Sequence, residues 1–189
     1  MPRRLPTLLL LLVAFAATAC ARATSTTVVM LVRHAEKASE TETDPPLSAT
    51  GQARARALAE ALADAGVSSV VVTQRRRTGD TAAPLTAARG LVPDTVPIGG
   101  PMPDHAAAVA ARIRARHLGG TVLVVGHSNT VPPIMAALGA RPLPDICDGT
   151  YDQLFILVLR NGIADALTQA RFGPASPAGG ADCTGMQSR

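Results

Sequence analysis

A short apolar run that ends in charged side chains does most to limit the fold of this chain. Residues 28–32 (VVMLV) are all apolar and mostly β-branched. A run of this length and type predicts a strand that is buried on both faces of a sheet. Arg33 and His34 follow directly. Because open α/β sheets bind ligands at the carboxyl ends of their strands, these two side chains mark a candidate site.

Two further apolar runs end in a similar way. Residues 70–72 (VVV) lead to Arg77, and residues 122–125 (VLVV) lead through a glycine to His127. We expect these strand ends to meet at one edge of the sheet. The side chains brought together there would be Arg33, His34, Arg77 and His127. Since guanidinium groups bind phosphate oxygens in pairs and stay charged, the pattern predicts a site for a dianionic phosphoryl group.

Helix signals lie between the predicted strands. Ser48 is a candidate N-cap for a helix that stops at Gly66. Residues 77–88 predict a second helix, whose unpaired N-terminal N–H groups would favour an anion near Arg77. A third helix is expected from Asp104 to near Gly119, and a fourth follows residue 129 with two prolines in its first turn.

The last two predicted strands form a hairpin. Residues 153–159 and 163–172 flank Asn161-Gly162, a strong hairpin turn signal. Alternating strands and helices over residues 24–172 predict one α/β domain, a three-layer α/β/α sandwich with a mostly parallel sheet. Residues 173–189 are rich in Gly, Pro, Ser and Ala, and we expect a disordered tail there.

Four motifs, in order, resemble the first branch of the histidine phosphatase superfamily, the phosphoglycerate-mutase-like fold. They are residues 33–36 (RHAE), 47–51 (LSATG), 73–82 (TQRRRTGDTA) and 126–129 (GHSN). The resemblance spans about residues 27–172. The family pattern has glycine where this chain has Ala35. Because a methyl group disfavours positive φ, this loop must close with ordinary dihedral angles.

The resemblance implies an activity and a set of roles. His34 would be the nucleophile of a phosphomonoester hydrolase and would form a covalent phosphohistidine. Arg33, Arg77 and His127 would bind the phosphoryl group and stabilise the charge of its transition state. No metal or other cofactor is expected, and His105 and His117 are interpreted as surface residues.

The sequence offers several candidates for the group that donates a proton to the leaving alkoxide. Members of the superfamily often use a carboxylate between the second arginine and the second histidine, where this chain has Asp94 and Asp104 after Thr81. Asp94 suits a turn or a sheet edge. Asp104, at a predicted helix start, is the candidate proton donor, with an N-cap role as its alternative. The other candidates are Glu36, Asp44, Asp148, Asp152 and bound water.

Other functions fit parts of the pattern. A phosphoglycerate-mutase-type phosphotransferase would use the same pocket, although this chain is short for one. A non-catalytic phosphate- or sugar-phosphate-binding lipoprotein would keep the anion site, but has no need of a nucleophile. A serine hydrolase using Ser128 lacks the final glycine of its motif and a histidine after residue 127. We therefore favour a phosphatase acting on a small-molecule or envelope phosphoester.

The N-terminus predicts export. Arg3 and Arg4 precede an apolar run at residues 8–16, and the small residues 17–19 offer a cleavage site, so residues 1–23 are typical of a signal peptide. The run is short for a membrane span. Cleavage before Cys20 resembles a bacterial lipobox and would give a lipoprotein. Cleavage without lipidation would give a soluble periplasmic protein.

Cysteines and charge limit the partners further. In an oxidising compartment Cys147 and Cys183 could pair or remain thiols. The formal net charge of +4 falls to about +2 once Arg3 and Arg4 leave with the signal. Aromatic residues make up 2% of the chain, too few for a base-stacking surface. We expect no nucleic acid partner, and membrane contact only through a lipid on Cys20.

Overall fold

A six-stranded sheet forms the centre of the computed structural model, which describes residues 25–176. The strand order is β3-β2-β4-β1-β5-β6. The strands are β1 (Thr26–Arg33), β2 (Val67–Val72), β3 (Asp94–Thr95), β4 (Thr121–Gly126), β5 (Gln153–Arg160) and β6 (Ile163–Arg171). The helices are α1 (Ala49–Ala61), α2 (Arg76–Arg89), α3 (Met102–Arg116) and α4 (Val131–Ala137). The predicted signal peptide, with Cys20, and residues 177–189 lie outside the described residues.

The sheet is mixed. Strands β3, β2, β4 and β1 run parallel, as the sequence predicts, whereas β5 is antiparallel to both β1 and β6. The turn between β5 and β6 has φ 53° at Asn161 and φ 80° at Gly162. Positive φ at both central residues is typical of the two-residue turns whose twist matches that of paired strands. The predicted hairpin is therefore confirmed.

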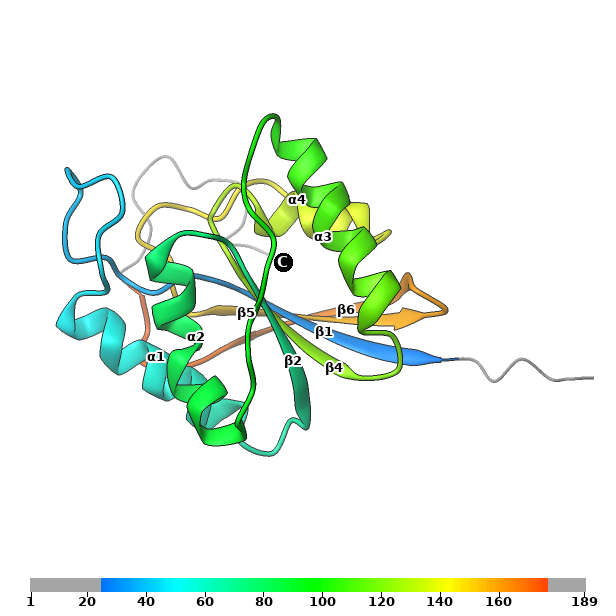
Figure 1. The fold of residues 1–189 in the computed structure, drawn as a ribbon, viewed down its shortest axis with the longest axis horizontal. Coiled ribbons are helices and arrows are strands. Elements are labelled where there is room, and N and C mark those ends of the chain that lie inside the picture. The colour runs from blue at the N-terminus through cyan, green and yellow to red at the C-terminus, as the bar shows by residue number, and fades with distance from the viewer. Residues whose placement is uncertain (1–24, 177–189) are drawn as a thin grey trace, which may run out of the picture.

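Helices cover both faces of the sheet (Figure 1), which confirms the predicted α/β/α sandwich. Side chains of β1 alternate between two cores: Val29 and Leu31 pack with α3 and α4, and Val32 packs with α1 and α2. The strand is buried on both faces because successive side chains point to opposite sides. Both cores exclude water from the strands whose carboxyl ends carry the candidate site.

The first residues of α1 and α3 can be compared with the N-caps predicted from the sequence. Ser48 Oγ accepts a hydrogen bond from Gly51 N–H at 3.0 Å, so the predicted N-cap of α1 is confirmed. Helix α3 begins earlier than expected, with Pro101 at its cap position. The N–H of Asp104 already donates to Pro101 O at 3.1 Å. Asp104 therefore lies inside the first turn, and its interpretation as an N-cap is wrong.

The chain keeps specific contacts beyond Phe172. Arg54 Nη1 donates to Pro174 O at 2.7 Å, and Ser176 Oγ accepts from the N–H groups of Tyr151 and Asp152. Ordered contacts thus extend to the end of the described residues, past the predicted domain boundary. Among residues 25–176, no helix has the length and apolar character needed to cross a membrane.

Candidate active site

The ends of β1 and β4 bring two histidines together. These strands are paired in register, with Arg33 opposite Gly126, and His34 N–H donates to Gly126 O at 2.9 Å. The next residue on each strand is a histidine. As a result, the rings of His34 and His127 lie edge to face with their centroids 5.1 Å apart.

His34 is buried and held in one tautomer. Its Nδ1 lies 2.8 Å from Ala35 O. A carbonyl oxygen can only accept, so Nδ1 carries the proton and Nε2 keeps its lone pair. Burial, followed by the positive charges of Arg33 and Arg77, lowers the pKa of His34 to about 3 although the bond to Ala35 acts in the opposite direction. Nε2 is therefore an unprotonated nitrogen at neutral pH.

The loop after His34 is fixed to α2. Ala35 N–H donates to Thr81 Oγ1 at 2.9 Å, and Thr81 Oγ1 donates to Arg77 O at 2.7 Å. Among the described residues other than glycine, positive φ occurs at Asn161 alone. Ala35 thus closes the loop with ordinary dihedral angles, as expected.

Glu36 anchors the same loop to α1. Its carboxylate accepts three hydrogen bonds of 2.7–3.0 Å from the buried guanidinium of Arg54. A Cβ at Gly51 would lie 2.1 Å from Glu36 O, which explains the glycine in this motif. Because the Glu36 carboxylate is occupied by Arg54, it is a poor candidate for a proton donor.

His127 lies between a hydroxyl and a guanidinium. Its Nε2 is 3.0 Å from Thr73 Oγ1, and its Nδ1 is 3.3 Å from Arg77 Nη2. Its own N–H donates to Thr130 Oγ1 at 2.7 Å. Burial, followed by the charges of His34 and Arg77, lowers the pKa of His127 to about 3. Both histidines are therefore neutral near pH 7.

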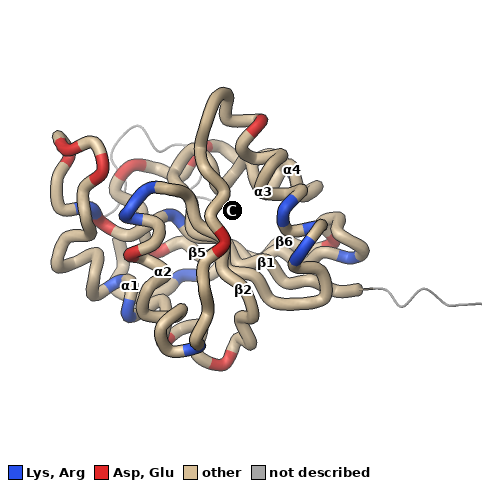
Figure 2. Tube along the Cα trace, in the orientation of Figure 1, with Lys and Arg blue, Asp and Glu red and all other residues tan. Residues whose placement is uncertain are grey.

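Arg77 stands in the first turn of α2, which Figure 2 shows as a basic segment. Burial, and next the nearby Arg75, lowers the pKa of Arg77 from its ordinary value. Its Nη1 is 3.6 Å from Asp44 Oδ1, and the same carboxylate accepts from Arg76 N–H at 3.1 Å. Asp44 therefore accepts from the first N–H of α2 and also faces the guanidinium of Arg77.

Arg33 is held by a loop that the sequence did not predict. Its Nη1 donates to Cys147 O at 2.9 Å, and its Nη2 is 3.3 Å from Asp148 Oδ1. The ring of Tyr151 lies 4.3 Å from Arg33 Cζ and 6.3 Å, between centroids, from the ring of His34. The one sequence signal was that Tyr151 is the only tyrosine of an aromatic-poor chain.

Comparison with known proteins agrees with this geometry. The family model described as "Histidine phosphatase superfamily (branch 1)" matches residues 29–97, which carry Arg33, His34 and Arg77. Over these residues the chain is similar to the histidine phosphatase superfamily, branch 1. No curated protein matches it.

Solved structures share the histidine phosphatase fold. The protein histidine phosphatase SixA complexed with tungstate is 19% identical, with a TM-score of 0.61, over 76% of this chain and 96% of that one. A mycobacterial glucosyl-3-phosphoglycerate phosphatase is 18% identical, with a TM-score of 0.59, over 77% of this chain and 98% of that one. At such identities the likeness establishes the fold.

The four predicted site residues, Arg33, His34, Arg77 and His127, are thus in one cluster. Asp104, by contrast, is exposed on the first turn of α3. Its neighbour His105 is 3% exposed, so its interpretation as a surface residue is wrong. His105 Nδ1 donates to Pro97 O at 3.1 Å, and the residue is close enough to His127 to lower its pKa.

Asp94 pairs with residues outside the cluster of Arg33, His34, Arg77 and His127. It belongs to the edge strand β3, which confirms its predicted place at a sheet edge. Its carboxylate pairs with Arg112 and lies 3.4 Å from His117 Nε2. Burial alone would raise the pKa of Asp94, but hydrogen bonds from Arg112 and His117 hold it below its ordinary value. Asp94 has a structural role.

Cys147 is disulfide-bonded. Cys183 lies outside the described residues, so a pairing between these two cysteines stays a prediction. Within residues 25–176, no three His, Cys, Asp or Glu side chains form a group suited to a metal ion.

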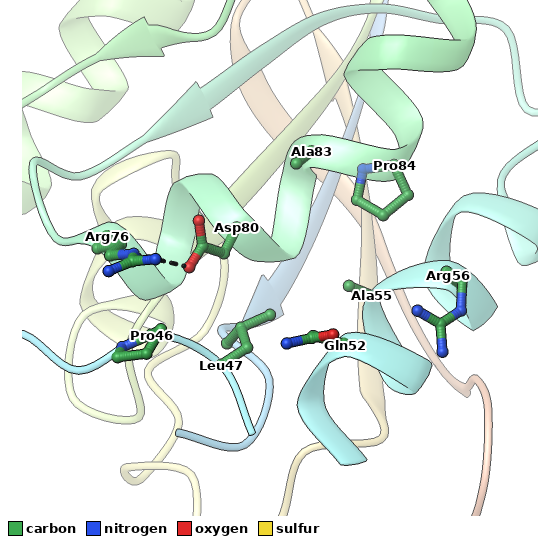
Figure 3. Close-up of a pocket in the computed structure, with 9 residues that line it drawn as sticks. All are labelled: Pro46, Leu47, Gln52, Ala55, Arg56, Arg76, Asp80, Ala83 and Pro84. Atoms are coloured by element: carbon green, nitrogen blue, oxygen red, sulfur yellow. Dashed lines mark ion pairs between the residues drawn. The ribbon is translucent and has the colours of Figure 1, made fainter. Parts of the chain in front are cut away.

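A cavity of about 330 Å³ lies between α1 and α2 (Figure 3). Its walls include Leu47, Ala55 and Pro84, and the ion pair of Arg76 and Asp80 lies at one end. None of the four clustered residues lines it. The cavity is therefore separate from the cluster of Arg33, His34, Arg77 and His127, although α2 contributes residues to both.

Proposed function

We propose that this chain is a phosphomonoester hydrolase that works through a covalent phosphohistidine at His34. One observation carries the proposal: the bond from Nδ1 to Ala35 O leaves Nε2 of a neutral, buried imidazole free to attack. An imidazole with its second nitrogen held by an acceptor is the form that a nucleophilic histidine requires.

The reaction has two steps. His34 Nε2 attacks phosphorus and the bond from phosphorus to the ester oxygen breaks, with the alkoxide taking a proton. Water then attacks the phosphohistidine, releases inorganic phosphate and restores His34. Charge develops on the equatorial oxygens in both steps, and nearby guanidinium groups stabilise it.

Arg33 and Arg77 suit this role because each retains an unused donor. The Nε atoms of both guanidinium groups are buried without a hydrogen-bond partner in the part of the chain that the structure describes. A phosphoryl group would supply the oxygen acceptors that these side chains lack, and paired Arg–phosphate bonds are strong. His127 would be a third group facing the phosphoryl oxygens.

We further propose Asp104 as the donor of the leaving-group proton. Its place in the first turn of α3, beside His105, whose charge helps to lower the pKa of His127, supports this role. Its exposure lets the carboxyl group reach a bound ester without breaking an ion pair. Asp44 and Asp148, which face Arg77 and Arg33, are the competing candidates.

The activity is proposed to need no metal, because residues of this chain account for both the attack and the charge stabilisation. The substrate would be a small-molecule or envelope phosphoester. Two structural neighbours support a phosphoester-binding site: a mycobacterial glucosyl-3-phosphoglycerate phosphatase, and the protein histidine phosphatase SixA, which was solved with the oxyanion tungstate. A mutase-type phosphotransferase and a non-catalytic binding protein are the alternatives.

A phosphoester panel tests the proposal. The purified protein, with and without a chelator, is assayed on p-nitrophenyl phosphate, glycerol phosphate and 3-phosphoglycerate. Phosphate release that persists with chelator and vanishes in His34→Ala is expected. His117→Ala, a histidine outside the cluster, should keep the activity. Phosphate moved within 3-phosphoglycerate without release would indicate a mutase, and binding without turnover would indicate a binding protein.

Export and lipidation are separate proposals that rest on residues 1–23. A signal peptide that ends before Cys20 would place the domain outside the cytoplasm, anchored by lipid on that cysteine. In a bacterial expression host, labelled fatty acid should enter the wild-type protein and not Cys20→Ala. A soluble mature protein beginning at Thr24 would remove the lipoprotein and keep the export.

A further inference from the structure

A short chain of buried hydroxyls lies behind His127. Thr73 is 5% exposed and Thr78 is fully buried. Thr73 Oγ1 is 3.0 Å from His127 Nε2 and 3.1 Å from Thr78 Oγ1. Both threonines follow β2, Thr73 directly and Thr78 in the first turns of α2. The hydroxyls therefore connect the second histidine to the start of the helix that carries Arg77.

Arg77 fixes the direction of the first hydrogen bond. A guanidinium group donates and cannot accept, so His127 Nδ1, 3.3 Å from Arg77 Nη2, must be the acceptor. The imidazole of His127 is neutral because its burial disfavours the charged form. Its single proton must then be on Nε2, which donates to Thr73 Oγ1.

The backbone fixes the direction of the remaining hydrogen bonds. Thr73 Oγ1 also accepts from Arg75 N–H at 3.3 Å, so its two lone pairs are used and its proton points to Thr78 Oγ1. Thr78 Oγ1 accepts in addition from Thr73 N–H at 3.2 Å and donates to Arg75 O at 2.8 Å. In this arrangement the ring nitrogens of His127 and both threonine hydroxyls have their hydrogen-bond partners. A reversed chain would not achieve this, because it would set Nδ1–H against Arg77.

We propose that Thr73, backed by Thr78, is a positioning residue that keeps the proton of His127 on Nε2 and holds Nδ1 beside Arg77. Nδ1, which accepts from the Arg77 guanidinium in the free protein, is then the nitrogen that would take up a proton once a bound anion engages that guanidinium in its place. The kinetic consequence rests on the proposed function, since Nδ1 would meet the phosphoryl group. The tautomer itself does not depend on that function.

Nitrogen-15 NMR of the four histidines tests the tautomer directly. Long-range correlations from ring carbon-bound protons identify which nitrogen carries hydrogen, and the signals lost in His127→Gln identify His127. At pH 7 the wild-type protein should show His127 as the Nε2–H tautomer, with that proton protected from solvent exchange. A wild-type His127 protonated on Nδ1 would overturn the proposal without any threonine variant.

Three threonine variants test the cause. Thr73→Val keeps the shape and removes the hydroxyl, and Thr73→Ser restores a hydroxyl. Thr86→Val is the matched control, because Thr86 is a buried threonine of α2 whose hydroxyl donates to Ala83 O. The Nε2–H signal should lose its protection in Thr73→Val, and keep it in Thr73→Ser and Thr86→Val.

Kinetics separate positioning from a structural role. With p-nitrophenyl phosphate, kcat/KM should fall about 10- to 100-fold in Thr73→Val, as for a misplaced group at a reacting centre. It should recover most of its value in Thr73→Ser and stay unchanged in Thr86→Val. A Thr73→Val protein with a protected Nε2–H and wild-type kcat/KM would contradict the proposal.

The two proposals fail in different ways. If the wild-type protein turns over no phosphoester, the proposed function fails, and the NMR comparison alone decides the role of Thr73. If turnover is normal and the NMR signals of Thr73→Val match the wild type, the positioning role fails alone. Should Thr73→Val not fold, Thr78→Val offers the same comparison one hydroxyl further along the chain, with Thr78→Ser as its rescue.

Discussion

At the scale of single residues, the site uses two neighbouring histidines in opposite tautomers. His34 carries its proton on Nδ1, which donates to Ala35 O. His127 carries its proton on Nε2, which donates to Thr73 Oγ1. Burial keeps both rings neutral by lowering the pKa of each to about 3. One ring thereby keeps an unprotonated Nε2, and the other keeps an unprotonated Nδ1 that accepts from Arg77.

Loss of either site arginine should cost activity more than stability. Arg33→Ala and Arg77→Ala remove guanidinium groups that would stabilise the transition state, and a single such donor contributes about 10²–10³-fold to kcat. Steady-state kinetics with p-nitrophenyl phosphate measure this loss. Arg76→Ala is the control, because Arg76 is exposed and paired with Asp80. Equal losses in Arg76→Ala and Arg77→Ala would contradict the assignment.

Anion binding should take up a proton at His127. Sulfate stays a dianion between pH 5 and 8, and a bound dianion favours the charged imidazolium. Since the pKa of His127 in the free protein is about 3, proton uptake accompanies binding as long as the pH is below the pKa in the complex. Sulfate affinity, measured by calorimetry, should therefore fall as the pH rises, by up to about tenfold per unit. A His127→Gln protein with the same pH dependence would contradict this account.

Leaving-group dependence tests Asp104. An acid donor matters for a poor leaving group such as glycerol and little for p-nitrophenolate. Asp104→Asn should slow glycerol phosphate hydrolysis by about 10²-fold while p-nitrophenyl phosphate changes little. Asp44→Asn and Asp148→Asn are compared alongside, because these carboxylates face Arg77 and Arg33. Equal effects of Asp104→Asn on both esters, or none, would reassign the donor.

At the scale of elements, Asp152 joins the hairpin to residues that follow it. Its buried Oδ2 accepts from Arg171 Nη1 at 2.7 Å and from Ser176 N–H at 3.2 Å. Burial alone would raise the pKa of Asp152, but hydrogen bonds from Arg171 and Ser176 outweigh it and lower the pKa below 3.8. The carboxylate therefore stabilises the folded state only while it is ionised.

Asp152→Ala should lower the free energy of unfolding by about 2 kcal/mol at pH 7. Because the folded pKa is below the unfolded one, this difference is complete above the unfolded pKa and shrinks as the pH falls below about 4. Urea unfolding at several pH values measures it. Asp165→Ala, which breaks an exposed pair with Arg160 in the same hairpin, is the control. A difference that grows on acidification would refute the assignment.

The elements differ in how far the sequence predicts them. The β1, β2 and β4 strands were predictable because short unbroken apolar runs are typical of strands that are buried on both faces of a sheet. The arginine and histidine cluster follows from their shared edge. The loop from Ile146 to Tyr151, which holds Arg33, was not predictable, since backbone carbonyls such as Cys147 O leave no trace in a sequence. The burial of His105 against Pro97 O depends on a tertiary contact of the same kind.

At the scale of the whole molecule, helices cover both faces of the sheet (Figure 1), and a buried core lies on each face. The carboxyl ends of β1 and β4 carry the candidate site. The loop after His34 is tied to α2 through Thr81 and to α1 through Arg54. The four clustered residues are therefore held by the strand ends, α1 and α2, an arrangement that would suit the proposed reaction, in which positioning supplies most of the catalysis.

Trapping of the phosphoenzyme tests the central claim most directly. The protein is mixed with a radiolabelled phosphomonoester, quenched within milliseconds in alkali, which preserves phosphohistidine, and digested for mass spectrometry. We expect acid-labile phosphate on His34 of the wild-type protein, in an amount that rises before steady-state turnover, and none in His34→Ala. Turnover without any phosphate on His34, or at the wild-type rate in His34→Ala, would contradict the account.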